Sequence, residues 1–239
     1  MDDIAILIPA YEPDEQLPRF VTEIRQTFRH VVVVDDGSTT GREVFTAVRP
    51  NVDVVLAHPC NRGKGAALRT GLAWIRDHLP DVRGVVTADA DGQHRPHDVL
   101  RVATALRGHK GGIVLGVRAF SGDVPLRSRF GNWWARQIFR LLTGASVADT
   151  QTGLRGIPRD LFAQMLAIPG DRYEYEMEML AQAATLPQPP LQIPIETVYI
   201  AANKSSHFQP LRDTLRTQGV MFRHFFQRRL FHAHTRRRG

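Results

Sequence analysis

Two carboxylates and an amide stand at alternating positions in the segment DADGQH, as Asp89, Asp91 and Gln93. They follow directly on the apolar, β-prone residues 84–88, which are typical of a buried strand. Like charges this close would normally force one carboxyl group to take up a proton, unless a cation lies between them. Carboxylate and amide oxygens suit Mg²⁺ or Mn²⁺, with phosphate oxygens completing the coordination. We therefore predict a metal site here, although aspartate and glycine are also common at turns.

A second group of candidate residues is cationic. Arg118, Arg127 and Arg129 follow the apolar residues 112–117, and planar guanidinium groups match phosphate oxygens in pairs. The alternative is a solvated helix face. Lys64 stands in NRGKG, which lacks the spacing of the common phosphate-binding loops. That segment indicates either a backbone and lysine contact close to a nucleotide, or only a tight turn before a helix.

Short apolar segments alternate with amphipathic segments through the first half of the chain. Apolar runs of strand length occupy residues 4–10, 30–38, 52–57, 84–89 and 112–117. Helical spacing of apolar residues occurs at residues 15–28, 41–48, 63–79 and 96–108. Four consecutive valines, at residues 31–34, fit a strand that is covered on both faces. The alternation predicts an α/β fold with an open, mostly parallel sheet and flanking helices.

The polar clusters all fall where predicted strands end. Parallel strands place their carboxyl ends along one edge of a sheet, and ligands of such sheets bind beyond that edge. We therefore expect one site built from PAYEP, DDGSTTG, NRGKG, DADGQH and VRAF. His94 and His97 are isolated histidines of the fourth segment and are expected at the surface. The second half is less regular, with helices expected at residues 126–142, 158–167 and 173–184 and an edge strand within 191–200.

Length and composition indicate one large domain with a short appendage. The chain has 239 residues, of which 43% are hydrophobic and 23% are charged, and these values are ordinary for a globular protein. The single cysteine, Cys60, excludes an internal disulfide. The sequence shows neither the pattern of a secretory signal nor an apolar run of about 18 residues. We therefore expect neither export nor a transmembrane helix.

The net charge of +7 is concentrated at the C-terminal end. Residues 214–239 hold seven arginines and no acidic residue, so 24 basic residues balance 24 acidic residues in the rest of the chain. Helical spacing relates the apolar residues Leu211, Leu215, Phe222, Phe225, Phe226 and Leu230. We predict a domain at 1–210 and a basic amphipathic C-terminal helix at 211–239 that lies on an anionic membrane surface. Alternatively, the phenylalanines pack onto the domain or form a dimer seam.

Six segments, taken in order, resemble the family 2 inverting glycosyltransferases. They are IPAYEP, VVVVDDGSTTG, NRGKGAALRTG, ADADGQH, DTQTGLRGIPR and YEYEMEML, and the resemblance covers about residues 4–206. It is greatest to the dolichyl- and undecaprenyl-phosphate sugar synthases of the dolichyl-phosphate mannose synthase type. The resemblance implies a GT-A fold, in which an α/β domain that binds a nucleotide sugar carries a D-x-D metal site.

The resemblance also implies roles for matching positions. Residues expected to bind the nucleotide sugar are Pro9, Tyr11, Glu12, Asp35, Asp36 and Asp89, and Lys64 joins them because of its loop NRGKG. Residues expected to bind the metal and diphosphate are Asp89, Asp91 and Gln93. Arg118, together with Arg127 or Arg129, is expected to contact phosphate groups. Lys204 matches a basic residue of the acceptor loop. Glu12 stands one residue earlier than the carboxylate of the family's usual Pro-x-Tyr-Asn-Glu.

The expected activity is metal-dependent, inverting transfer of a sugar from a UDP- or GDP-linked donor to a polyprenyl phosphate at the cytoplasmic face of the membrane. A nucleoside diphosphate leaving group needs a cation and arginines to stabilise its developing charge. A phosphate acceptor has a second pKa of about 6 and needs no strong base.

Asp149, in ADTQTG, is therefore expected to orient the acceptor or the sugar. With a carbohydrate hydroxyl as acceptor, it would instead be the general base. An alternative of another class is a nucleic-acid-binding protein that acts through its arginine-rich tail. Nucleic acid is not the expected partner, because the body of the chain has no basic bias.

Overall fold

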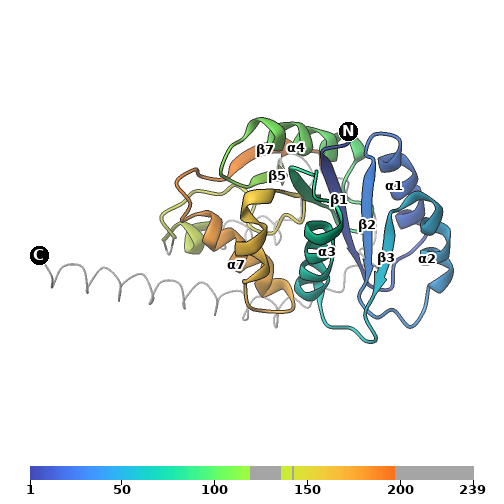
Figure 1. Cartoon of the computed structure of the whole chain (residues 1–239). Coiled ribbons are helices and arrows are strands. Elements are labelled where there is room, and N and C mark those ends of the chain that lie inside the picture. The colour runs from blue at the N-terminus through green and yellow to red at the C-terminus, as the bar shows by residue number, and fades with distance from the viewer. Residues whose placement is uncertain (119–135, 142, 197–239) are drawn as a thin grey trace, which may run out of the picture.

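The computed structural model describes residues 1–118, 136–141 and 143–196. At its centre is a seven-stranded sheet in the order β3-β2-β1-β4-β6-β5-β7 (Figure 1). The strands are β1 (Ile4–Ala10), β2 (His30–Asp35), β3 (Val54–Ala57), β4 (Gly84–Thr87), β5 (Val114–Arg118), β6 (Arg155–Pro158) and β7 (Leu191–Ile195). The helices are α1 (Gln16–Arg25), α2 (Arg42–Val48), α3 (Lys64–His78), α4 (Pro96–Gly108), α6 (Phe162–Leu166) and α7 (Tyr173–Ala183). Two short 3₁₀ turns are η1 (Arg49–Asn51) and η2 (Arg159–Leu161).

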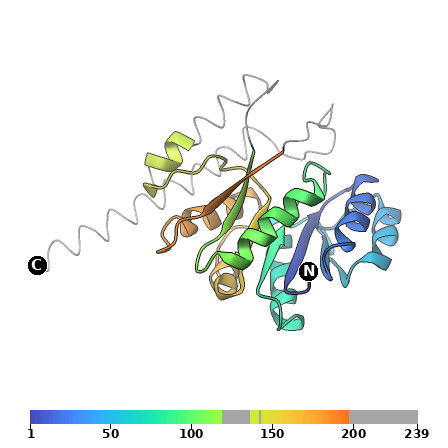
Figure 2. The same cartoon turned by 90° about the horizontal axis from the view of Figure 1, so that it is seen from above.

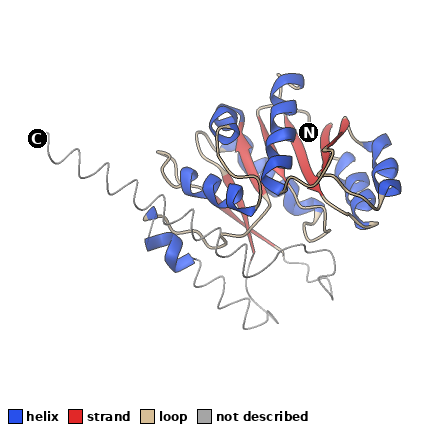
Figure 3. Cartoon of the chain, turned by 90° about the horizontal axis from the view of Figure 1, so that it is seen from below, coloured by secondary structure: helices blue, strands red, loops and turns tan. Residues whose placement is uncertain are grey.

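Helices cover both faces of this sheet, which forms the central layer (Figure 3). One core lies between the sheet and α1, α2 and α4, and the other lies between the sheet and α3, α6 and α7. The valines of β2 alternate between these cores, because successive side chains of a strand point to opposite faces. Val31 and Val33 enter the first core, and Val32 and Val34 enter the second. The prediction of a strand covered on both faces is confirmed.

The predicted α/β fold with an open, mostly parallel sheet is confirmed. The strands β1 to β4 pair in parallel with one another, and β7 pairs in parallel with β5. The strands expected near residues 4–10, 30–38, 52–57, 84–89 and 112–117 and the four expected helices of the first half all occur, with small differences at their ends. The carboxyl ends of the parallel strands therefore lie along one edge of the sheet.

Strand β6 was not predicted, and it changes the arrangement of the sheet. It lies antiparallel between β4 and β5, with Arg155 opposite Thr87 of β4 and Leu115 of β5. Because β6 runs backwards, its amino end lies at the edge where β4 ends. Residues 149–153, which precede β6, therefore lie at the same edge of the sheet as the D-x-D segment. The helix expected at 158–167 is also shorter than predicted, since β6 ends at Pro158 and α6 begins at Phe162.

Strand β7 forms the edge of the sheet opposite β3. The edge strand predicted from the prolines is therefore confirmed. Figure 2 shows the blue N-terminal helices at one end of the sheet and the orange β7 toward the other. Within the helix expected at 126–142, residues 136–141 are helical. The C-terminal helix predicted at 211–239 and the domain boundary at residue 210 lie outside the described residues. No helix in the part of the chain that the structure describes has the length and hydropathy of a membrane-spanning segment.

Candidate active site

The D-x-D segment meets a lysine from another loop at the sheet edge. The ammonium Nζ of Lys64 lies 2.7 Å from Oδ1 of Asp89 and 3.0 Å from Oε2 of Glu176. Burial alone would raise the pKa of Asp89, but the charge of Lys64 and the neighbouring His94 hold it well below its usual range. Lys64 therefore places a positive charge beside Asp89, in addition to the metal ion that the sequence predicts between the two carboxylates. Glu176 was not singled out from the sequence.

Glycines on either side of Lys64 allow α3 to approach α7 closely enough for Lys64 to contact Glu176. A Cβ atom added to Gly63 would lie 2.4 Å from the carbonyl oxygen of Asp171, and one added to Gly65 would lie 2.5 Å from Cβ of Tyr175. The start of α3 therefore packs directly on the start of α7, and the two helices lie side by side in Figure 1. The NRGKG segment is thus a close-packed turn before a helix that also presents its lysine to the site. The interpretation as a tight turn before a helix is confirmed, and the contact of Lys64 with a nucleotide stays a prediction.

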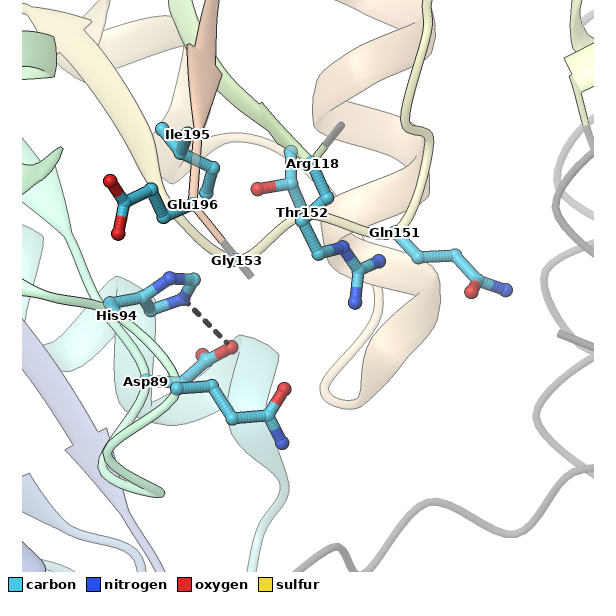
Figure 4. Close-up of a pocket in the computed structure, with 9 residues that line it drawn as sticks. Asp89, His94, Arg118, Gln151, Thr152, Gly153, Ile195 and Glu196 are labelled. Carbon is cyan, nitrogen blue, oxygen red and sulfur yellow. Dashed lines mark ion pairs between the residues drawn. The ribbon is translucent and has the colours of Figure 1, made fainter. Parts of the chain in front are cut away.

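His94 is buried, contrary to the surface position expected from the sequence. Its side chain is 7% exposed, and Nε2 lies 3.4 Å from Oδ2 of Asp89. Among the described residues, neither ring nitrogen has a hydrogen-bond partner. Figure 4 shows the ring directed at Asp89 across a pocket, with Arg118 reaching into the same space from the opposite wall. His94 lines the pocket together with Asp89, so it belongs to the site.

Asp91 and Gln93 lie on the same turn as Asp89. The backbone N–H of Gln93 donates to Oδ1 of Asp91 at 3.1 Å. Burial, and after it the charge of Asp89, raise the pKa of Asp91. A cation at this turn would relieve both effects, because it stabilises the charged form of each carboxylate.

These residues fit a divalent cation whose coordination is completed by phosphate oxygens. The residues that the structure describes include no cluster of three or more His, Cys, Asp and Glu side chains that could hold a metal by themselves. Mg²⁺ is commonly bound by only one or two carboxylates together with water and the phosphates of the substrate. Asp89 and Asp91 would supply those two carboxylates, and Gln93 lines the same pocket as Asp89.

Gly153, in the turn before β6, packs closely against the carboxylate of Asp89. A Cβ atom at this position would lie 2.3 Å from Oδ2 and 2.6 Å from Oδ1 of Asp89. The hydroxyl of Thr87 donates to the carbonyl oxygen of Gly153 at 2.7 Å, which ties the turn to the end of β4. The carboxylate can thus occupy its place only because residue 153 has no side chain. The sequence shows that residue 153 is a glycine, but only the structure shows that Asp89 approaches it closely.

Arg118 and Asp149 form an ion pair at the wall of the pocket. Nε of Arg118 lies 2.6 Å from Oδ2 of Asp149, and Nη2 lies 3.1 Å from Oδ1. Asp149 is fully buried, and its Oδ1 also accepts a hydrogen bond from the backbone of Gln151. A carboxylate with these partners orients the guanidinium group. Arg118 in turn lines the pocket beside Asp89.

The first two loops carry carboxylates that accept hydrogen bonds from the protein itself. The carboxylate of Asp36 accepts from the backbone of Arg62 at 3.0 Å and Gly63 at 2.7 Å, and lies 2.7 Å from Nδ1 of His58. It therefore anchors the loop that carries Lys64. Asp35 accepts from the backbone of Ser38 at 2.8 Å.

Glu12 joins the first loop to the second. Its carboxylate accepts hydrogen bonds from the backbone and hydroxyl groups of Thr39 and Thr40. The bonds from Thr40 and Thr39 lower the pKa of Glu12 from 4.5 to about 2. Pro9 is buried at the end of β1, and Tyr11 is half-buried just beyond it. Five of the residues predicted to bind the nucleotide sugar therefore lie in or beside the first two loops, and all three carboxylates among them accept hydrogen bonds from the protein itself.

Three predicted site residues, Arg127, Arg129 and Lys204, lie outside the described residues. Besides His94, Glu176 and Gly153, the sequence interpretation also missed Arg155. This arginine is almost fully buried on β6. Its Nε donates to the carbonyl oxygen of Thr152 at 2.9 Å, and Nη1 donates to the carbonyl oxygen of Glu176. It therefore links the turn before β6 to the first turn of α7.

Comparison with known proteins agrees with this arrangement. A sequence model of the family described as Glycosyl transferase family 2 matches residues 5–166. The UDP-N-acetylglucosamine–dolichyl-phosphate N-acetylglucosaminyltransferase of Methanococcus voltae is 28% identical over 217 residues, covering 82% of this chain and 86% of that protein. The undecaprenyl-phosphate mannosyltransferase of Micrococcus luteus is 28% identical over 206 residues, covering 82% of this chain and 83% of that protein.

Solved structures share the fold. Glucosyl-3-phosphoglycerate synthase from Mycobacterium tuberculosis, solved with Mn²⁺, UDP and phosphoglyceric acid, superposes with a TM-score of 0.68 at 17% sequence identity. The match covers 93% of this chain and 78% of that structure. At this identity the likeness concerns the arrangement of the sheet and helices.

Proposed function

Because the chain belongs to glycosyl transferase family 2, we propose that it transfers a sugar from a nucleotide sugar to a polyprenyl phosphate, with inversion at the anomeric carbon and with Mg²⁺ or Mn²⁺. The observation that supports this proposal is the D-x-D turn after β4, where Asp91 lies close enough to Asp89 for their charges to interact and Asp89 and Gln93 line a pocket together with Arg118. The names of the two relatives from Methanococcus and Micrococcus, which act on dolichyl and undecaprenyl phosphates, support the choice of acceptor.

In such a transfer the protein has to stabilise the departing diphosphate, whereas the acceptor phosphate needs little activation. Asp89, Asp91 and Gln93 would hold the cation, which supplies positive charge to the diphosphate as it departs. Lys64 and Arg118 add positive charge close to Asp89. An acceptor phosphate is already largely ionised near neutral pH, since its second pKa is about 6. It can attack the anomeric carbon without a strong protein base.

The test is direct transfer from labelled donors. Purified full-length protein is incubated with UDP- and GDP-linked sugars, undecaprenyl phosphate in detergent, and either Mn²⁺ or a chelator. We expect one donor to give a lipid-linked product of inverted anomeric configuration, assigned by NMR, and the chelator to abolish its formation. Transfer only to carbohydrate hydroxyl groups would contradict the acceptor, and equal rates with the chelator would contradict the metal.

Asp149→Asn distinguishes a phosphate acceptor from a hydroxyl acceptor. In the proposed reaction Asp149 acts through Arg118, so we expect a loss of about tenfold in kcat/KM, the usual scale for losing a group that orients a functional side chain. The pH dependence of kcat/KM should be unchanged. A general base for a hydroxyl acceptor would contribute about 10²- to 10⁴-fold, and its removal would also eliminate the acidic limb of the pH profile. Nucleotide binding, measured by calorimetry, serves as the control.

The acceptor's polyprenyl chain stays in the bilayer, so the enzyme is expected to act as a peripheral protein at the cytoplasmic membrane face. The sequence pattern of residues 211–239 favours an interfacial helix, and each arginine near an anionic surface contributes about 1 kcal/mol. We expect the full chain to sediment with anionic vesicles and to be released from them by high salt. It should not sediment with neutral vesicles. Truncation after Pro210 should abolish sedimentation. Unchanged vesicle binding by the truncated chain would disprove the role of this segment.

A further inference from the structure

The ammonium group of Lys64 bridges two carboxylates that belong to different elements. It lies 2.7 Å from Asp89, after β4, and 3.0 Å from Glu176, in the first turn of α7. The exposed fractions of the side chains of Lys64, Asp89 and Glu176 are 19%, 27% and 11%. Burial disfavours the ammonium form, but the charges of Asp89 and Glu176 outweigh it and raise the pKa of Lys64. The bridge is therefore charged at neutral pH.

A divalent cation on the D-x-D carboxylates would compete with this bridge. The cation and the ammonium group would share Asp89, and two positive charges at that separation repel each other. Without the cation, however, Lys64 offsets the repulsion between Asp89 and Asp91, whose pKa is raised by burial and by Asp89. The same lysine thus stabilises the metal-free site and opposes metal binding.

The surrounding backbone leaves the lysine side chain as the part that can move. The close packing of Gly63 and Gly65 on α7 fixes the start of α3. The backbone N–H of Ala66 donates to the carbonyl oxygen of Asp171 at 2.9 Å, and Arg155 donates to the carbonyl oxygen of Glu176. Both helix starts are held, whereas lysine has a flexible four-carbon stem.

From these contacts we propose that Lys64 is the built-in counter-ion of Asp89, which an incoming divalent cation displaces, and that Glu176 is the positioning residue that retains the lysine when it leaves. The inference rests on the proposed metal-dependent function. It makes Glu176 a determinant of metal affinity although it is not a metal ligand. It also predicts that removing the two members of the Lys64–Glu176 pair changes metal affinity in opposite directions.

The experiment measures Mn²⁺ affinity by electron paramagnetic resonance of free Mn²⁺, first without nucleotide and then with UDP or GDP, whose phosphates would complete the coordination. Lys64→Met should bind Mn²⁺ about tenfold more tightly than the wild type, and Glu176→Gln about tenfold more weakly, within the range of coupling between contacting charges. The double variant should match Lys64→Met, because Glu176 acts only through the lysine. Glu174→Gln removes the same charge from the same turn of α7 and should bind as the wild type does.

Thermal unfolding provides a second measurement that does not depend on activity. The Tm of the wild type should change little when a chelator is added, because Lys64 takes the place of the cation. The Tm of Lys64→Met should fall in the chelator and recover with Mn²⁺.

The outcomes separate this inference from the proposed function. If the wild type binds Mn²⁺ but Lys64→Met binds no more tightly, the inference fails and the metal-dependent function stands. A double variant much weaker than Lys64→Met would mean that Glu176 acts by its charge alone, which also overturns the inference. If neither the wild type nor Lys64→Met binds Mn²⁺ even with UDP or GDP present, the inference and the metal role fail together.

Discussion

Asp91→Asn is expected to lower the rate of sugar transfer by about 100-fold or more while leaving the protein folded. The substitution keeps the shape of the side chain and removes one of the two charges at the D-x-D turn. A bound metal ion contributes several kcal/mol of charge stabilisation to a transition state, and a loss of about 3 kcal/mol corresponds to a factor of about 100. The rate is measured with saturating donor and Mn²⁺.

The stability of the same variant should move in the other direction. Because the pKa of Asp91 is raised in the folded chain, this carboxyl group favours folding below its ordinary pKa. That contribution is lost as pH rises through its ordinary pKa toward the raised folded value. At neutral pH the charged carboxylate therefore opposes folding, and Asp91→Asn should keep or raise the Tm.

The matched control for this prediction is Asp81→Asn, which removes a charge from an exposed loop position. It should leave both rate and Tm unchanged. Full activity of Asp91→Asn would show that its charge is not needed. A fall in Tm would show that the carboxylate stabilises the fold rather than the reaction.

Gly153→Ala is expected to reduce kcat/KM about 100-fold by displacing Asp89, without a change in any charged residue. The added methyl group would lie 2.3 Å from Oδ2 of Asp89, so the carboxylate has to shift. A misplacement of about 1 Å in an active site can cost about 100-fold. Mn²⁺ affinity should fall together with activity, whereas the far-ultraviolet circular dichroism spectrum should match the wild type.

Gly108→Ala is the corresponding control, because a Cβ atom at the end of α4 would meet nothing within 4 Å. Its activity and Mn²⁺ affinity should equal those of the wild type. If Gly153→Ala has normal activity and normal Mn²⁺ affinity, the close approach of Asp89 to residue 153 has no functional role.

The apolar pattern of the sequence determined most of the fold. The valines of β2 and the helical spacing of Leu17, Phe20 and Ile24 in α1 specify which faces are buried, and the structure buries all of them. This information is local, because the period of a strand or helix relates residues only a few positions apart. The sequence also located the D-x-D carboxylates and Arg118 at the ends of strands, and from this a shared edge followed.

Tertiary structure alone decided which side chains meet at that edge. Strand β6 reverses direction and enters between β4 and β5, and only this places Gly153 beneath Asp89. The pairing of Lys64 with Glu176 joins segments that no local period relates. His94 is buried beside Asp89, although its neighbours in the sequence are polar.

The physical reason is the range over which each interaction acts. Burial of apolar side chains is additive along an element, so its pattern can be read from spacing. The contacts of Asp149 with Arg118, and of Lys64 with two carboxylates, depend on the order of strands and on the packing of α3 against α7. A charged side chain can satisfy several partners equally well until the fold brings one of them within about 3 Å, so its partner is chosen only by the complete structure.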